Sequence, residues 1–83
     1  MITVYGKSSC FWCTKAKELL DQYQMKYEYY NVDNHDKLFE LMEKLPNMKT
    51  VPQIWWHDRH IGGYTDLLRE IENTSGGYGD NVF

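Results

Sequence analysis

Residues 2–13, ITVYGKSSCFWC, decide how this chain begins to fold and what chemistry it carries. The apolar and β-branched side chains of residues 2–6 predict a short strand, and a polar loop separates them from a helical pattern that starts near Phe11. The loop ends at Cys10, Cys13 follows one helical turn later, and the chain has no other cysteine. Two thiols at this spacing can close and reopen a small disulfide ring, which is what a redox couple requires.

The two thiols are predicted to be unequal. Cys13 falls on one helical stripe with Ala16, Leu20 and Tyr23, so its sulfur should face the core. Cys10 lies just before the first helical turn, where unpaired N–H groups and the helix dipole favour the thiolate. An exposed attacking thiolate beside a buried resolving thiol is the arrangement that thiol–disulfide exchange needs.

The composition is that of one small globular domain. The 83 residues are 42% hydrophobic and 16% aromatic, which is enough apolar mass for one core. A net charge of −3 argues against nucleic-acid binding, since phosphate contacts need clustered basic residues. No apolar run approaches the roughly 20 residues of a membrane span, and no signal-like segment follows Met1. We therefore expect a cytoplasmic protein without a membrane partner, in which paired cysteines are typical of catalysis or metal binding.

The sequence pattern around and beyond the cysteines predicts strands and helices in alternation. The expected elements are a strand over 2–5, a helix over 11–23, a strand over 27–32, a helix capped by Asn34 or Asp36 and ended by Pro46, a strand over 53–56, a short strand through Ile61 and a helix over 65–72. The second helix should bury Leu38, Leu41, Met42 and Leu45, with Phe39 also in the core.

This order, βαβαββα, predicts an α/β, thioredoxin-like fold: a four-stranded mixed sheet flanked by three helices that cover both of its faces. A helix links the first two strands, so they should be parallel with a right-handed crossover, and the last two should form a hairpin. Residues 1–73 should make up the domain, and the polar, turn-rich residues 74–83 a flexible C-terminal tail.

Three separated segments resemble the signature blocks of the small dithiol glutaredoxins, of the short bacterial and viral type. They are KSSCFWC (7–13), TVPQI (50–54) and HIGGYTDL (60–67), and the resemblance extends over residues 1 to about 73. It implies a glutathione-dependent thiol–disulfide oxidoreductase that reduces protein disulfides and glutathione mixed disulfides, with Cys10 as nucleophile and Cys13 as resolving thiol. It also implies glutathione as the reductant, no metal, disulfide-containing proteins as partners and a monomer. Electron donation to ribonucleotide reductase is implied by analogy alone.

The resemblance further implies where glutathione binds. The Val51–Pro52 bond should be cis, which would turn the Val51 backbone toward the cysteines to pair with an extended thiol ligand. The amides at the start of the third helix suit the γ-glutamyl carboxylate. The Asp66 carboxylate would meet the ammonium, and Lys7 would meet the glycyl carboxylate. The implied site comprises Lys7, Trp12, Thr50, Val51, Pro52, Gly63, Thr65 and Asp66.

The chain departs from the family pattern at two positions. Phe11-Trp12 replaces the Pro-Tyr pair that many members carry between the cysteines, which frees the loop and adds apolar surface at its rim. Phe39 occupies the position where a glutamine or arginine often holds glutathione, with Lys37 and Lys49 as candidate substitutes.

Three alternatives stay open at the level of sequence. The first is a thioredoxin-like donor recharged by a flavoprotein reductase, and the second is an iron–sulfur cluster carrier. The third is a zinc site made of the two cysteines with His57 and His60, which the tight histidine spacing disfavours. The histidines are more simply polar residues of a hairpin and a loop.

Overall fold

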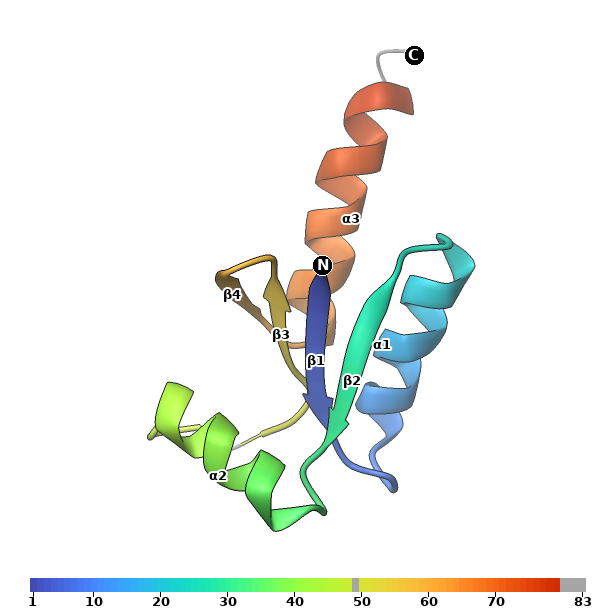
Figure 1. The fold of residues 1–83 in the computed structure, drawn as a ribbon. Helices are drawn as coiled ribbons and strands as arrows, with labels where there is room; N and C mark the ends of the chain where they lie inside the picture. Colours follow the sequence, from blue (N-terminus) through green and yellow to red (C-terminus); the bar gives the residue numbers. More distant parts are fainter. Residues whose placement is uncertain (49, 80–83) are drawn as a thin grey trace.

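A four-stranded sheet in the order β2-β1-β3-β4 lies at the centre of the structure (Figure 1). This computed structural model describes residues 1–48 and 50–79, with side chains as far as Asn73. The strands are β1 (Ile2–Gly6), β2 (Tyr27–Asn31), β3 (Gln53–Trp56) and β4 (Arg59–Gly62), and the helices are α1 (Phe11–Gln22), α2 (His35–Lys44) and α3 (Tyr64–Gly79). β1 pairs with β2 in parallel, whereas the β1–β3 and β3–β4 pairs are antiparallel. The predicted thioredoxin-like order, the parallel first pair and the hairpin are confirmed.

The helices cover the two faces of the sheet with different side chains. α1 and α3 pack on one face, where aliphatic groups dominate a cluster that includes Val4, Ala16, Leu20, Ile54, Leu67 and Ile71. α2 covers the other face, where the smaller cluster contains Tyr5, Val32 and Leu41 and is bordered by aromatic residues such as Tyr30 and Trp55. Neighbouring residues of β1 point to opposite faces, so Val4 and Tyr5 belong to different clusters.

The start of α2 shows which of the two predicted caps is used. The Asn34 side chain accepts hydrogen bonds from the N–H groups of Asp36 and Lys37, at 2.9 and 3.2 Å. Asn34 thus satisfies two donors that have no partner within the helix, while Asp36 lies inside the first turn. The helix ends at Lys44, before Pro46, as predicted.

Three apolar side chains that were expected in the core are exposed instead. Tyr23 is the C-cap residue of α1, so the buried stripe ends one turn earlier, at Leu20. Phe39, which is 59% exposed, and Met42 lie on α2, whose only fully buried residue is Leu41. Because α2 is short and contacts the sheet along one narrow stripe, a hydrophobic residue off that stripe has nothing to pack against.

α3 continues to Gly79, past the end expected near Glu72. No proline interrupts residues 64–79, and a glycine inside a helix costs only about 1 kcal/mol, so the polar composition alone does not stop the helix. The division into a domain and a flexible tail stays a prediction, since residues 80–83 lie outside the described part of the chain. Among the described residues, no helix is long and apolar enough to span a bilayer.

Candidate active site

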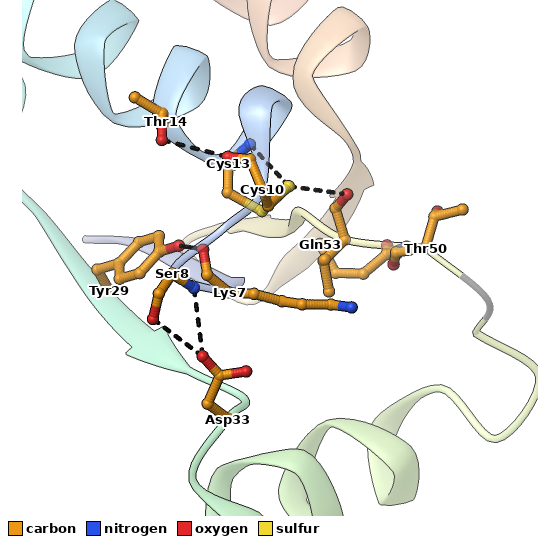
Figure 2. The surroundings of a disulfide bond; sticks show 10 residues. Lys7, Ser8, Cys10, Cys13, Thr14, Tyr29, Asp33, Thr50 and Gln53 are labelled. Carbon is orange, nitrogen blue, oxygen red and sulfur yellow. Dashed lines mark hydrogen bonds between the residues drawn. A yellow bond between two sulfur atoms is a disulfide. The ribbon is translucent and has the colours of Figure 1, made fainter.

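Cys10 and Cys13 form a disulfide at the N-terminus of α1 (Figure 2). Cys10 is the N-cap residue, with extended backbone angles (φ −104°, ψ 118°), and its Sγ accepts a hydrogen bond from the Cys13 N–H at 3.1 Å. This N–H is one of the first-turn donors that have no partner within the helix, and it would stabilise a thiolate at Cys10 after reduction. Cys13 is 0% exposed, whereas Cys10 is partly exposed. The predicted difference in burial is confirmed.

The burial of Cys13 depends on a glycine at the end of β1. A Cβ atom on Gly6 would lie 2.9 Å from Cys13 Sγ and would also overlap the Tyr29 hydroxyl. That hydroxyl donates a hydrogen bond to the backbone carbonyl of Lys7, at 3.2 Å. Burial, and secondly the charge of Asp33, raise the pKa of Tyr29, so the phenol keeps the proton that it donates.

A hydrogen-bond network ties the loop before Cys10 to the end of β2 (Figure 2). Ser8 Oγ donates to Asp33 Oδ2 at 2.9 Å, and Asn31 Nδ2 donates to Ser8 Oγ at 2.9 Å. The Asp33 N–H in turn donates to Asn31 Oδ1 at 2.8 Å. Sequence reasoning missed the tasks of Asn31, Asp33 and Tyr29. One signal was available in the sequence. Asn31 and Asp33 lie at the carboxyl end of β2, and because β2 is parallel to β1, this end lies beside the loop that follows β1.

The segment Thr50–Pro52 brings backbone groups to the disulfide. The Val51–Pro52 peptide bond is cis, as predicted. The Val51 carbonyl oxygen lies 3.7 Å from Cys10 Sγ, while the Val51 side chain packs against the smaller cluster under α2. Pro52 is buried and Thr50 is exposed, so this segment passes from the core to the surface beside Cys10.

Two hollows flank this segment. The larger, of about 550 Å³, is lined by Lys7, Ser9, Cys10, Val32, Leu38, Met48, Thr50 and Val51. The smaller, of about 280 Å³, is lined by Trp12, Thr50, Val51, Pro52, Gly63, Tyr64 and Thr65. Every residue predicted to bind glutathione, except Asp66, lines one of the two hollows. The structure therefore brings together groups that are far apart in the sequence.

Asp66 has a structural task at the start of α3. Its Oδ2 accepts a hydrogen bond from the Gly63 N–H at 3.1 Å, an interaction typical of a capping box. The neighbouring Gly62 has a positive φ of 117°, and a Cβ atom there would overlap the Asp66 carboxylate. The amides of Tyr64, Thr65 and Asp66 lie in the first helical turn, where no acceptor within the helix is available. An anion in the smaller hollow could accept from them.

Aromatic side chains form the rim between the cysteines and α3. Phe11 is 65% exposed and Trp12 is 53% exposed, and their rings meet edge to face with centroids 5.0 Å apart. Trp12 also packs against Tyr64 at 5.3 Å. This exposed apolar surface borders the smaller hollow.

Of the three lysines considered for ligand binding, one lines a hollow. Lys7 extends from the loop after β1 toward the Thr50 segment (Figure 2), with no carboxylate partner among the described residues. Lys37 instead lies over the Tyr30 ring at 4.2 Å and pairs with Glu40 at 3.3 Å, and it lines neither of the two hollows, so a ligand contact from Lys37 stays a prediction. Lys49 lies outside the described residues.

The alternative zinc site is not assembled. His57 Nδ1 contacts the amino group of Met1 at 2.8 Å, and His60 Nε2 contacts Gln53 Oε1 at 2.8 Å. Within the described ranges, no three His, Cys, Asp or Glu side chains gather in a way that could hold a metal ion.

Comparisons with known proteins agree with this geometry. The family model for glutaredoxin matches residues 2–61. Glutaredoxin 1 of Rickettsia conorii is 40% identical over 73 residues, which are 86% of this chain and 71% of that protein. Among solved structures, glutaredoxin 1 from Francisella tularensis, complexed with cacodylate, has a TM-score of 0.75 at 22% identity, covering 90% of this chain and 95% of that one. A buckwheat glutaredoxin–glutathione complex has a TM-score of 0.72 at 25% identity, covering 90% and 69%.

Proposed function

Because this chain belongs to the glutaredoxin family of thiol–disulfide oxidoreductases, we propose that it uses glutathione to reduce protein disulfides and glutathione mixed disulfides through Cys10 and Cys13. One observation carries the proposal. The Cys10 sulfur is partly exposed at a helix N-terminus and lines a hollow that also contains the Lys7 side chain. A thiolate there is reachable, stabilised and adjacent to a cation that suits a carboxylate.

The proposed cycle needs only these two sulfurs and glutathione. The Cys10 thiolate attacks one sulfur of the substrate disulfide, forms a mixed disulfide and releases the other sulfur as a thiolate. Cys13 then loses its proton and attacks Cys10 Sγ, which releases the reduced product and closes the Cys10–Cys13 disulfide described above. Two glutathione molecules reopen that bond in two exchange steps, and they leave as glutathione disulfide.

The two hollows offer a place for each end of the tripeptide. The glycyl carboxylate would pair with Lys7 in the larger hollow, and the cysteinyl backbone would pair with Val51. The γ-glutamyl carboxylate would accept from the first amides of α3 in the smaller hollow, with its ammonium near Asp66. The buckwheat relative was solved as a glutathione complex, which supports glutathione as the ligand class.

Protein substrates would meet the exposed aromatic rim formed by Phe11 and Trp12. Apolar side chains that flank a reactive cysteine could cover these two exposed rings. Electron donation to ribonucleotide reductase is part of the proposal by family analogy only. We expect a cytoplasmic monomer.

A thioredoxin-like donor recharged by a flavoprotein reductase is the second candidate. One observation favours it: among the described lysines, only Lys7 lines the larger hollow. Lys37 contacts Glu40 and the Tyr30 ring instead, so the described part of the hollow offers a glutathione carboxylate a single cation. A weak contact to the glycyl carboxylate would lower the affinity for glutathione without changing the chemistry of the sulfurs.

A coupled assay with a small glutathione mixed disulfide tests the proposal. We expect turnover that saturates with the mixed disulfide and is sustained by glutathione, glutathione reductase and NADPH, with no other reductase. Turnover only after a thioredoxin-type flavoprotein reductase is added would support the second candidate instead. Anaerobic reconstitution with iron and sulfide addresses the cluster carrier, because charge-transfer absorption bands in the purified protein would favour that third function.

A further inference from the structure

We propose that Gln53 and His60 are positioning residues, which together hold the Thr50–Val51 peptide group in the orientation that a thiol ligand must meet. The inference rests on the proposed function in one respect, because that function makes the Val51 backbone the partner of the ligand. Neither side chain lines a hollow that contains Cys10, so both would act through the backbone.

Two hydrogen bonds connect His60 to the segment beside the disulfide. Gln53 Nε2 donates to the Thr50 carbonyl oxygen at 2.8 Å, and Gln53 Oε1 lies 2.8 Å from His60 Nε2. The Thr50 carbonyl fixes the orientation of the Gln53 amide, and the Gln53 amide fixes which His60 nitrogen carries the proton. A carbonyl can only accept, so the Gln53 amide nitrogen must face Thr50, its oxygen must face His60, and His60 must carry a proton on Nε2.

The sheet places these side chains in line. Gln53 is the first residue of β3, and Trp55, two residues later, lies on the same face. His60 is the β4 partner of Trp55, and its ring packs against the indole with centroids 4.7 Å apart. The register of the β3–β4 pair shifts between Ile54 and Trp55, and across this irregularity His60 reaches Gln53 while its ring packs on Trp55.

The anchored carbonyl matters because of what lies across the same peptide group. The Thr50 carbonyl and the Val51 N–H belong to one planar unit and point in opposite directions. A hydrogen bond that fixes the carbonyl therefore fixes the N–H as well. Thr50 is exposed, so without the hydrogen bond from Gln53 this peptide group could turn toward water.

Backbone dynamics and kinetics test the proposal together in the full-length protein. Gln53→Met keeps the length of the side chain and removes both hydrogen bonds, whereas Gln22→Met at the end of α1 is the matched control. His60→Phe keeps the ring against Trp55 but cannot donate, and His60→Gln restores a donor. The readouts are the ¹⁵N order parameter of the Val51 amide, which needs no substrate, and the KM and kcat for a glutathione mixed disulfide.

We expect the Val51 order parameter to fall from about 0.85 to below about 0.6 in Gln53→Met. The fall should be smaller in His60→Phe, and Gln22→Met should show no fall. KM should rise about five-fold in Gln53→Met while kcat stays within about two-fold, because the backbone pairing forms equally in the ground and transition states. His60→Gln should recover the wild-type values. An unchanged Val51 order parameter in Gln53→Met would overturn the inference. If the wild-type protein failed to turn over glutathione mixed disulfides, the proposed function would be wrong. The order parameters would still show whether Gln53 and His60 hold the Thr50–Val51 peptide group.

Discussion

The two hollows beside Val51 are built from different chemistry. The larger one presents a side-chain cation, Lys7, on a flexible chain, and its walls come from the β1 loop, α2 and the Thr50 segment. The smaller one is lined by the start of α3 and by the ring of Trp12, and its donors are backbone amides. A side-chain cation can be removed by one substitution and is screened by salt, whereas helix amides are fixed by the fold. Carboxylate binding in the larger hollow should therefore depend more strongly on salt and on a single side-chain substitution than carboxylate binding by the backbone amides of the smaller one.

The largest effect should come from the sulfur that a ligand in either hollow must reach. Cys10→Ser should reduce turnover of every substrate to the uncatalysed rate, because no other thiolate is accessible. Cys13→Ser should spare reduction of glutathione mixed disulfides and cripple reduction of intramolecular protein disulfides. Both assays should be run on both variants. Equal losses in all four measurements would contradict the assignment of a reachable and a buried sulfur.

Lys7→Gln isolates the larger hollow. We expect KM for a glutathione mixed disulfide to rise about five-fold at low salt, since one exposed ion pair with the glycyl carboxylate is lost. The wild-type KM should also rise with ionic strength, and that slope should flatten in the variant. Lys26→Gln, at the other end of the sheet, serves as the control of equal charge change. A salt dependence that persists undiminished in Lys7→Gln would place the carboxylate elsewhere.

Asp66→Asn tests the smaller hollow with the helix start kept intact. An asparagine oxygen can still accept from the Gly63 N–H, so α3 should keep its first turn while the carboxylate charge is lost. We expect KM to rise about three-fold for the glutathione substrate. A mixed disulfide of N-acetylated glutathione, which has no ammonium, should show no difference between the two proteins. A difference of equal size for both substrates would indicate a purely structural effect.

The smallest effect should come from Tyr29→Phe, which removes the hydrogen bond to the backbone of Lys7, a residue that lines the larger hollow. The lost bond to the Lys7 carbonyl should raise KM about two-fold near neutral pH. Because the folded protein raises the pKa of Tyr29 above its ordinary value of 10.0, the bond stabilises the fold fully below pH 10. That contribution is lost as the pH rises through the folded pKa. Urea unfolding at pH 8 and pH 11 should therefore show the gap between wild type and variant closing, whereas Tyr23→Phe, an exposed control, should show no gap at either pH.

Periodic patterns predicted the fold well, because each element carries its own signal in a short stretch of sequence. The stripe through Cys13, Ala16 and Leu20 and the apolar strand before Cys10 needed no knowledge of the rest of the chain. The same method failed for Phe39 and Tyr23, since burial requires a facing surface, and the extent of that surface depends on how α2 and α1 are placed.

The candidate site was predictable only where a motif marks it. Residues 50–52 and 62–66 were found from their resemblance to family blocks, and the hollows bring them together. Contacts between side chains from different elements left no pattern in the sequence. The approach of Gly6 to Cys13, the bond from Tyr29 to the Lys7 carbonyl and the chain from His60 through Gln53 all depend on strand register, which sequence alone did not specify.

The position of Trp12 between the two cysteines has a practical consequence for following the reaction. A disulfide quenches the fluorescence of an indole next to it, so opening the Cys10–Cys13 bond should brighten the emission of Trp12. Trp55, on β3, instead packs against Tyr5 and His60. A Trp12→Phe variant would give the background fluorescence of Trp55 and Trp56, which can be subtracted. Stopped-flow emission should then give the rate of each electron-transfer half-reaction without a coupling enzyme.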